Sequence, residues 1–130
     1  MLPGRSATAE EYLAGAPARL RPVVEHLRLV VDVALPGAAL RLLRGTPTWG
    51  LGPTARKGAV CRMSLHPASV EFTLLRGRLV LDPSGRLRPV GRGQAASVRI
   101  GAAAEVDSAL FGTWLAQAGA LEREALIAAP

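Results

Sequence analysis

The chain has 130 residues, of which 49% are apolar, and it carries 16 basic against 10 acidic residues. This length and apolar content exclude an intrinsically disordered chain and suit a single domain over residues 1–130 with its own core. The single cysteine excludes an intrachain disulfide, and the most apolar run, residues 27–35, is too short to cross a bilayer. No apolar signal sequence opens the chain, so a cytoplasmic protein is expected.

The first predicted helix begins at a capping box. Thr8 and Glu11 have the spacing at which each side chain bonds the backbone of the other, and Gly15 and Pro17 end the helix soon after. Residues 1–7 are expected to form a loose leader.

The second helix is predicted from Ala18 to Leu35 and ended by Pro36 and Gly37. At helical spacing its residues form an apolar face for the sheet, a narrow polar stripe suited to local ion pairs, and a third, mostly apolar sector. That sector implies cover from a second helix or from a partner subunit. The face contains Leu20, Val23, Val24, Leu27, Val30, Val31 and Ala34; the stripe contains Arg21, Glu25, Arg28 and Asp32; the third sector contains Pro22, His26, Leu29 and Val33.

Between the helices the apolar period changes from that of a helix to that of a strand. Strands are predicted over residues 39–44, 59–65, 69–75, 78–81 and 96–100, with the turns 66–69 and 82–85 between them. The stretch 45–50, GTPTWG, is interpreted as a turn anchored by Trp49 beside the first strand. Arg62 and Glu71 are expected on one solvent face of the hairpin 59–75.

The last helix is predicted from a cap at Asp107 to about Gln117 or beyond, and residues 122–130 are a possible tail that extends it unless Gly119 interrupts the helix. It packs beside the second helix or forms a dimer seam, so monomer and homodimer both stay open. The order of elements gives an α+β fold, an antiparallel β-sheet packed against N-terminal and C-terminal helices. The apolar face of this helix contains Leu110, Phe111, Trp114, Leu115 and Ala118.

Candidate catalytic and metal-binding residues are few. Cys61 falls on the inward face of a strand, where a thiol is a small apolar side chain, and His26 lies in the third sector of the second helix. The sequence contains no Cys or His spacing typical of a metal site. We therefore expect no catalytic residue, no metal and no cofactor.

Arginines dominate the basic residues and gather in one region. Six of them fall within residues 76–99, where Asp82 is the one acid, and this region is the candidate for binding an anion or a nucleic acid. A solvated basic surface is the competing interpretation, because the arginine, alanine and glycine content is also typical of a GC-rich genome. The six are Arg76, Arg78, Arg86, Arg88, Arg92 and Arg99.

Three segments share features with a known family: GTPTW at residues 45–49, the RG…L.DPSG.L block from Arg76 to Leu87, and the final SVRI strand. In these segments the chain resembles the YdhG-like family of bacterial domains, most of which have no assigned function. The resemblance implies a frataxin-like α+β shape, an aromatic at Trp49 that pins a turn, and, from one branch of the family, an iron-chaperone role. The expected function is binding of a small ligand or a protein, with the anion and iron roles as alternatives. The candidate ligand-binding residues are Trp49, Arg44, Arg62, Arg76 and Arg99.

Overall fold

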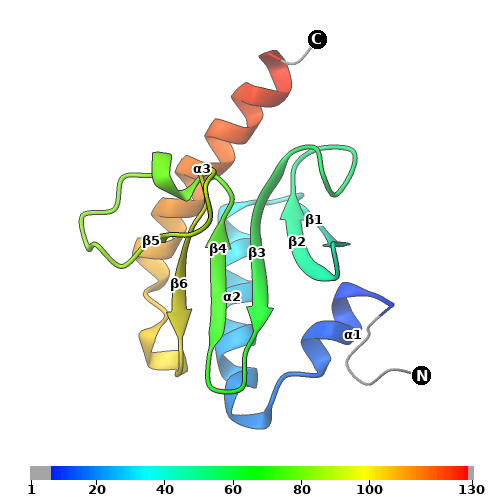
Figure 1. Ribbon diagram of the computed structural model, residues 1–130, viewed down its shortest axis with the longest axis vertical. Helices are drawn as coiled ribbons and strands as arrows, with labels where there is room; N and C mark the ends of the chain where they lie inside the picture. Colours follow the sequence, from blue (N-terminus) through cyan, green and yellow to red (C-terminus); the bar gives the residue numbers. More distant parts are fainter. Residues whose placement is uncertain (1–6, 129–130) are drawn as a thin grey trace.

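A computed structural model of the protein describes residues 7–128 and contains one six-stranded sheet backed by helices (Figure 1). The strand order is β1-β2-β3-β4-β6-β5, and every neighbouring pair is antiparallel. The predicted α+β class is therefore confirmed. The strands are β1 (Ala39–Leu43), β2 (Thr46–Gly50), β3 (Ala59–Leu65), β4 (Val70–Leu74), β5 (Arg88–Pro89) and β6 (Ala96–Ile100). The α-helices are α1 (Ala9–Ala14), α2 (Arg21–Ala34) and α3 (Ser108–Ala128).

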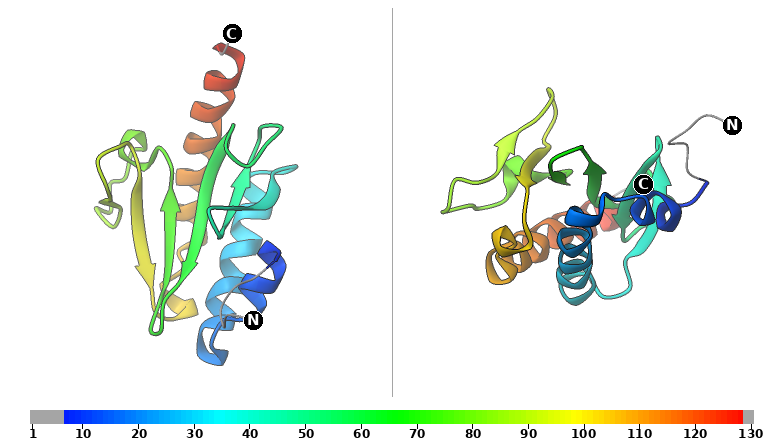
Figure 2. Two further views of the ribbon diagram at one scale, coloured as in Figure 1. Left: turned by 45° about the vertical axis from the view of Figure 1, so that its right-hand side comes forward. Right: turned by 90° about the horizontal axis from the view of Figure 1, so that it is seen from below.

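The helices α2 and α3 lie side by side on one face of the sheet (Figure 2). Alternate residues of a strand point to opposite faces of the sheet, and those that point toward these helices are apolar. One such row runs strand by strand across the whole sheet and supplies Trp49 and Cys61 to the core. Its members are Leu40, Trp49, Cys61, Leu74, Ala96 and Pro89. None of the helices in the described part combines the length and the apolar character that a membrane crossing requires.

The helix starts follow the sequence. Thr8 Oγ1 accepts a hydrogen bond from the Glu11 backbone at 3.0 Å, and Asp107 Oδ1 accepts one from the Leu110 backbone at 3.0 Å. Helix α3 continues unbroken through Gly119 as far as Ala128, so the tail extends the helix over its described part. Apart from residue 7, the predicted leader lies outside the described residues.

The polar stripe of α2 does not pair as predicted. Arg28 donates two hydrogen bonds of 2.7 Å to the carboxylate of Glu10 on α1, instead of bonding a neighbour on its own helix. These bonds lower the pKa of the Glu10 carboxyl below its ordinary value, although burial opposes the shift. The pair fastens α1 to α2.

The third sector of α2 is covered only in part, which corrects the sequence expectation. Helix α3 packs on α2, and His26 Nε2 lies 2.8 Å from Ser108 Oγ. However, Leu29 is 64% exposed and Val33 is 83% exposed, because α3 covers the sector only on the side of His26. No described residue covers this pair of side chains.

The interpretation of residues 45–50 as a turn is wrong. Residues Thr46–Gly50 form the strand β2 between β1 and β3, and the turn is the preceding pair Arg44 and Gly45. Pro47 fits within this strand because pairing with β3 begins only at Thr48. The strand predicted over 78–81 is also absent: Gly77–Leu79 is a 3₁₀ turn, and the Arg78 N–H bonds the carbonyl of Gln94 at 2.8 Å.

Arg44 occupies an unfavourable backbone region in the β1–β2 turn. Its φ is 52°, and that of Gly45 is 77°, as a type I′ hairpin turn requires. Asn is much better tolerated than Arg at the first position of this turn. We expect Arg44→Asn to raise the free energy of unfolding by about 1 kcal/mol, measured by urea denaturation.

Arg92→Asn is the matched control, since Arg92 is exposed in a loop and does not have a positive φ. It should leave stability unchanged. A loss of stability in Arg44→Asn would contradict the assignment of strain to this turn.

Candidate functional site

The sheet face opposite α2 and α3 carries most of the polar side chains of the strands. Arg62 and Ser64 on β3 lie opposite Thr73 and Glu71 on β4, so the four share one face as predicted, but Thr73 is 1% exposed and does not reach solvent. Continuing the row, Ser97 lies opposite Thr73 on the next strand, β6. We refer to this side of the sheet as the open face.

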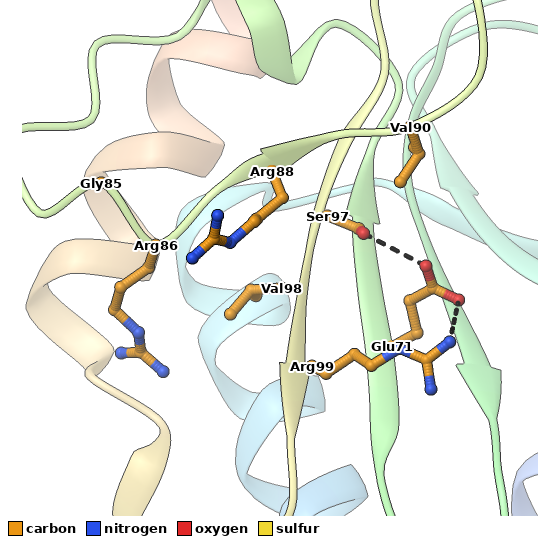
Figure 3. Close-up of a pocket in the computed structure, with 8 residues that line it drawn as sticks. All are labelled: Glu71, Gly85, Arg86, Arg88, Val90, Ser97, Val98 and Arg99. Carbon is orange, nitrogen blue, oxygen red and sulfur yellow. Dashed lines mark hydrogen bonds and ion pairs between the residues drawn. The ribbon is translucent and has the colours of Figure 1, made fainter.

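A hollow of about 620 Å³ lies at the edge of the open face, beside β6 and under the segment that leads into β5 (Figure 3). Because β5 pairs only with Ala96 and Ser97, the edge of β6 beyond Ser97 is left free of a strand. We call it the β6 hollow. It is lined by Glu71, Gly85, Arg86, Arg88, Val90, Ser97, Val98 and Arg99.

Arg86 is fixed in place by two contacts. Its guanidinium carbon lies 5.0 Å from the centre of the Phe111 ring, a cation–π distance, and Nη2 donates to the Glu105 carbonyl at 2.8 Å. Phe111 is fully buried and stacks on Trp114 with ring centres 4.6 Å apart. The core thus supports this guanidinium at the wall of the hollow.

Glu71 is the one acidic residue of the β6 hollow, and it has three partners. Ser97 Oγ donates to Glu71 Oε2 at 3.1 Å, His66 Nε2 lies 3.0 Å from Oε1, and Arg99 Nη2 lies 4.0 Å from Oε1. Burial by itself raises the pKa of Glu71, but the bonds from His66 and Ser97 and the charge of Arg99 lower it more. The carboxylate is therefore ionised at neutral pH and already engaged.

The charge balance of the β6 hollow is positive. Arg86, Arg88 and Arg99 contribute three guanidinium groups against the single carboxylate of Glu71. Arg88 is exposed on β5, and its side chain makes no hydrogen bond or ion pair with any residue from 7 to 128. Guanidinium groups form bidentate hydrogen bonds to carboxylates and phosphates, so this arrangement can hold an anion.

The structure does not bring the predicted ligand-binding residues together. Trp49 is 2% exposed within the core, and Arg76 Nε bonds Glu122 Oε2 of α3 at 2.8 Å. Arg99 lines the β6 hollow. Arg44 and Arg62 line a second hollow of about 250 Å³ on the open face near the β1–β2 turn. This hairpin hollow is formed by Leu43, Arg44, Thr46, Thr48, Arg56, Arg62 and Leu75.

The arginines of residues 76–99 divide into structural and available ones. Arg76 is paired with α3, and Arg78 Nη2 donates to the carbonyl of Gly91 at 2.7 Å, which ties down the loop before β6. Sequence reasoning missed Ser97, Glu71 and Arg56 as site residues. The two-residue period of the strands was a signal for Ser97 and Glu71, since it places both on the face of Arg99.

The residues considered for catalysis lie away from both hollows. Cys61 is fully buried, and burial raises the pKa of its thiol, which disfavours the reactive thiolate. His26 joins α2 to α3 through Ser108. Within residues 7–128, no three Cys, His, Asp or Glu side chains gather as a metal site would require.

Comparison with protein families, with curated proteins and with solved structures gives no match for this chain. The resemblance to the YdhG-like family therefore stays a prediction. The geometry of the open face is the basis for assigning a function.

Proposed function

We propose that the protein is a binding domain for an anionic ligand, which it holds by a phosphate or carboxylate group in the β6 hollow. The observation that carries the proposal is the set of three guanidinium groups around one neutralised carboxylate in a hollow of about 620 Å³. A net positive hollow attracts anions, and the walls beside Val90 and Val98 supply apolar surface for the rest of a small molecule.

Arg86 and Arg88 have different parts in this binding. Arg86 is held by Phe111 and by the Glu105 carbonyl, so its geometry is set before a ligand arrives and little side-chain entropy is lost on binding. Arg88 is exposed and supplies a further charge that closes on the ligand. Arg99, whose side chain is 60% exposed, reaches the hollow from β6.

The test is isothermal titration calorimetry of the protein with orthophosphate, pyrophosphate and citrate in turn. Saturable binding is expected for at least one of them, and Arg88→Gln/Arg99→Gln should weaken it at least tenfold. A hydrogen bond to a charged group is worth about 1.5 to 3 kcal/mol, so the loss of two such partners exceeds that factor. Both side chains are exposed, so the fold should not be affected.

Arg92→Gln/Arg123→Gln is the matched control, because it removes the same charge from exposed positions that line neither hollow. It should change the affinity less than twofold. Equal weakening by the two double variants would mean that the anion responds to the net charge of the protein and would refute a site in the β6 hollow.

A further inference from the structure

A row of polar side chains crosses the open face from one edge of the sheet to the other. Each member lies directly opposite the next across a strand pair, and residues opposite each other in antiparallel strands share a face. Its hydroxyl members are buried, whereas its arginines are partly or fully exposed, so the guanidinium groups are what this face presents at its surface. In strand order it consists of Arg41, Thr48, Arg62, Thr73, Ser97 and Arg88.

The hairpin hollow lies at the β2–β3 part of this row. It is lined by Arg44, Arg56 and Arg62, and none of its lining residues is acidic. These three guanidinium groups form no hydrogen bond or ion pair with residues 7–128. Three like charges in one hollow repel one another, so an anion that enters it is stabilised by all three.

The backbone places Arg44 at the rim of this hollow at an energetic cost. A long side chain at φ 52° is unfavourable, and the neighbouring Gly45 shows that the turn itself needs a left-handed conformation. Strained residues of this kind gather at functional sites. The strain therefore agrees with a binding role for Arg44, and the cluster of three guanidinium groups is the main support for that role.

The distance between the hollows limits the ligand. Arg62 on β3 and Arg88 on β5 are three strand spacings apart in the sheet order, or about 14 Å between backbones. A single phosphate cannot bridge that distance, whereas a chain of phosphates can. The large exposed apolar side chains of residues 7–128 include no aromatic residue, so the open face offers no platform for stacked bases.

We propose that the open face binds a linear chain of phosphates, with one group in the β6 hollow and another in the hairpin hollow. This inference rests on the proposed function in that the β6 hollow holds one end of the chain. Recognition is by the phosphates, so a single nucleic-acid strand and an inorganic polyphosphate present the same chemistry. The groups between the phosphates project away from the sheet.

The test compares orthophosphate, oligothymidylates of roughly 4 to 16 nucleotides and polyphosphates of matched charge. Affinity should rise with the length of the phosphate chain until the chain reaches both hollows. Once one end is bound in one hollow, binding in the other hollow becomes an intramolecular step. Arg56→Gln/Arg62→Gln should weaken long chains at least tenfold, whereas it should weaken orthophosphate binding less than Arg88→Gln/Arg99→Gln does. For oligothymidylate, the loss of two phosphate contacts should also reduce the slope of log K against log salt by about 1.4.

The controls separate this inference from the proposed function. Affinity that does not change with chain length would refute binding of a phosphate chain. The same holds if Arg92→Gln/Arg123→Gln weakens long chains as much as Arg56→Gln/Arg62→Gln does. If Arg56→Gln/Arg62→Gln has no effect on long chains, the hairpin hollow has no part and the inference also fails, while orthophosphate binding in the β6 hollow stands. If orthophosphate does not bind but the binding of long phosphate chains depends on both hollows, binding of a phosphate chain is supported and the small-anion proposal is refuted. Binding of only one polymer identifies the natural source of the chain.

Discussion

Replacement of Trp49 by alanine should lower the free energy of unfolding by about 3 to 5 kcal/mol, the usual cost of deleting a large buried aromatic side chain. Trp49 is 2% exposed and lies between Leu40 on β1 and Cys61 on β3 in the apolar row. Its indole belongs to the main apolar core of the domain. A domain stability of about 5 to 15 kcal/mol leaves the alanine variant close to unfolding.

The measurement is urea denaturation followed by far-ultraviolet circular dichroism. Trp49→Phe keeps an aromatic ring in the core and should lose distinctly less stability than Trp49→Ala. Orthophosphate affinity of the folded fraction should equal that of the unchanged protein, because Trp49 lines neither hollow. A stable alanine variant that has lost its affinity would instead make Trp49 a ligand contact, as the sequence alone suggested.

The ion pair between Arg76 and Glu122 carries the second large expected effect. Glu122 is 8% exposed, and its carboxylate lies 2.8 Å from Arg76 Nε. Arg76→Met leaves that carboxylate without its partner, and we expect a loss of about 2 to 3 kcal/mol, below the full cost of a deeply buried pair because Arg76 is partly exposed.

A double-mutant cycle checks this assignment. Arg76→Met/Glu122→Leu should recover most of the loss, since two apolar side chains can replace a buried ion pair at little cost. Arg28→Met serves as the control: Glu10 is 65% exposed, and breaking such a surface pair costs less than about 1 kcal/mol. No recovery in the double variant would mean that Arg76 acts through its own packing.

The hairpin from β3 to β4 could be predicted because local and tertiary signals agree there. Met63 and Phe72 alternate with polar neighbours and lie opposite each other, facing the helices. The cap at Asp107 was equally readable, because the bond from Leu110 spans one helical turn. Such features depend on residues that are close in sequence.

Strand β2 was missed because its sequence contains strong turn signals. Pro47 and the glycines at its two ends favour a loop, yet pairing with β1 and β3 outweighs these local preferences. Conversely, residues 78–81, RLVL, are a short apolar run typical of a strand, but the Arg78 N–H bonds Gln94 outside any strand. Propensity cannot show which strand has a neighbour to pair with.

The candidate site was predictable only as a region. Arg76 and Arg88 carry the same signal in the sequence, but Arg76 pairs with Glu122, which is 46 positions away, while Arg88 forms no ion pair within residues 7–128. The association of Arg56 with Arg62 depends on the path of the loop between β2 and β3. Such partners follow from tertiary structure and have no counterpart in sequence spacing.

The two margins of the sheet differ in their resistance to unwanted strand addition. On one side β5 has only two residues, one of them Pro89, and arginines flank the edge of β6 beyond it. On the other side β1 presents five residues, and Arg41 is its one charged side chain. Proline and charge both discourage backbone pairing between molecules. Aggregation through edge-to-edge pairing would thus begin at β1, where a single guanidinium is the protection.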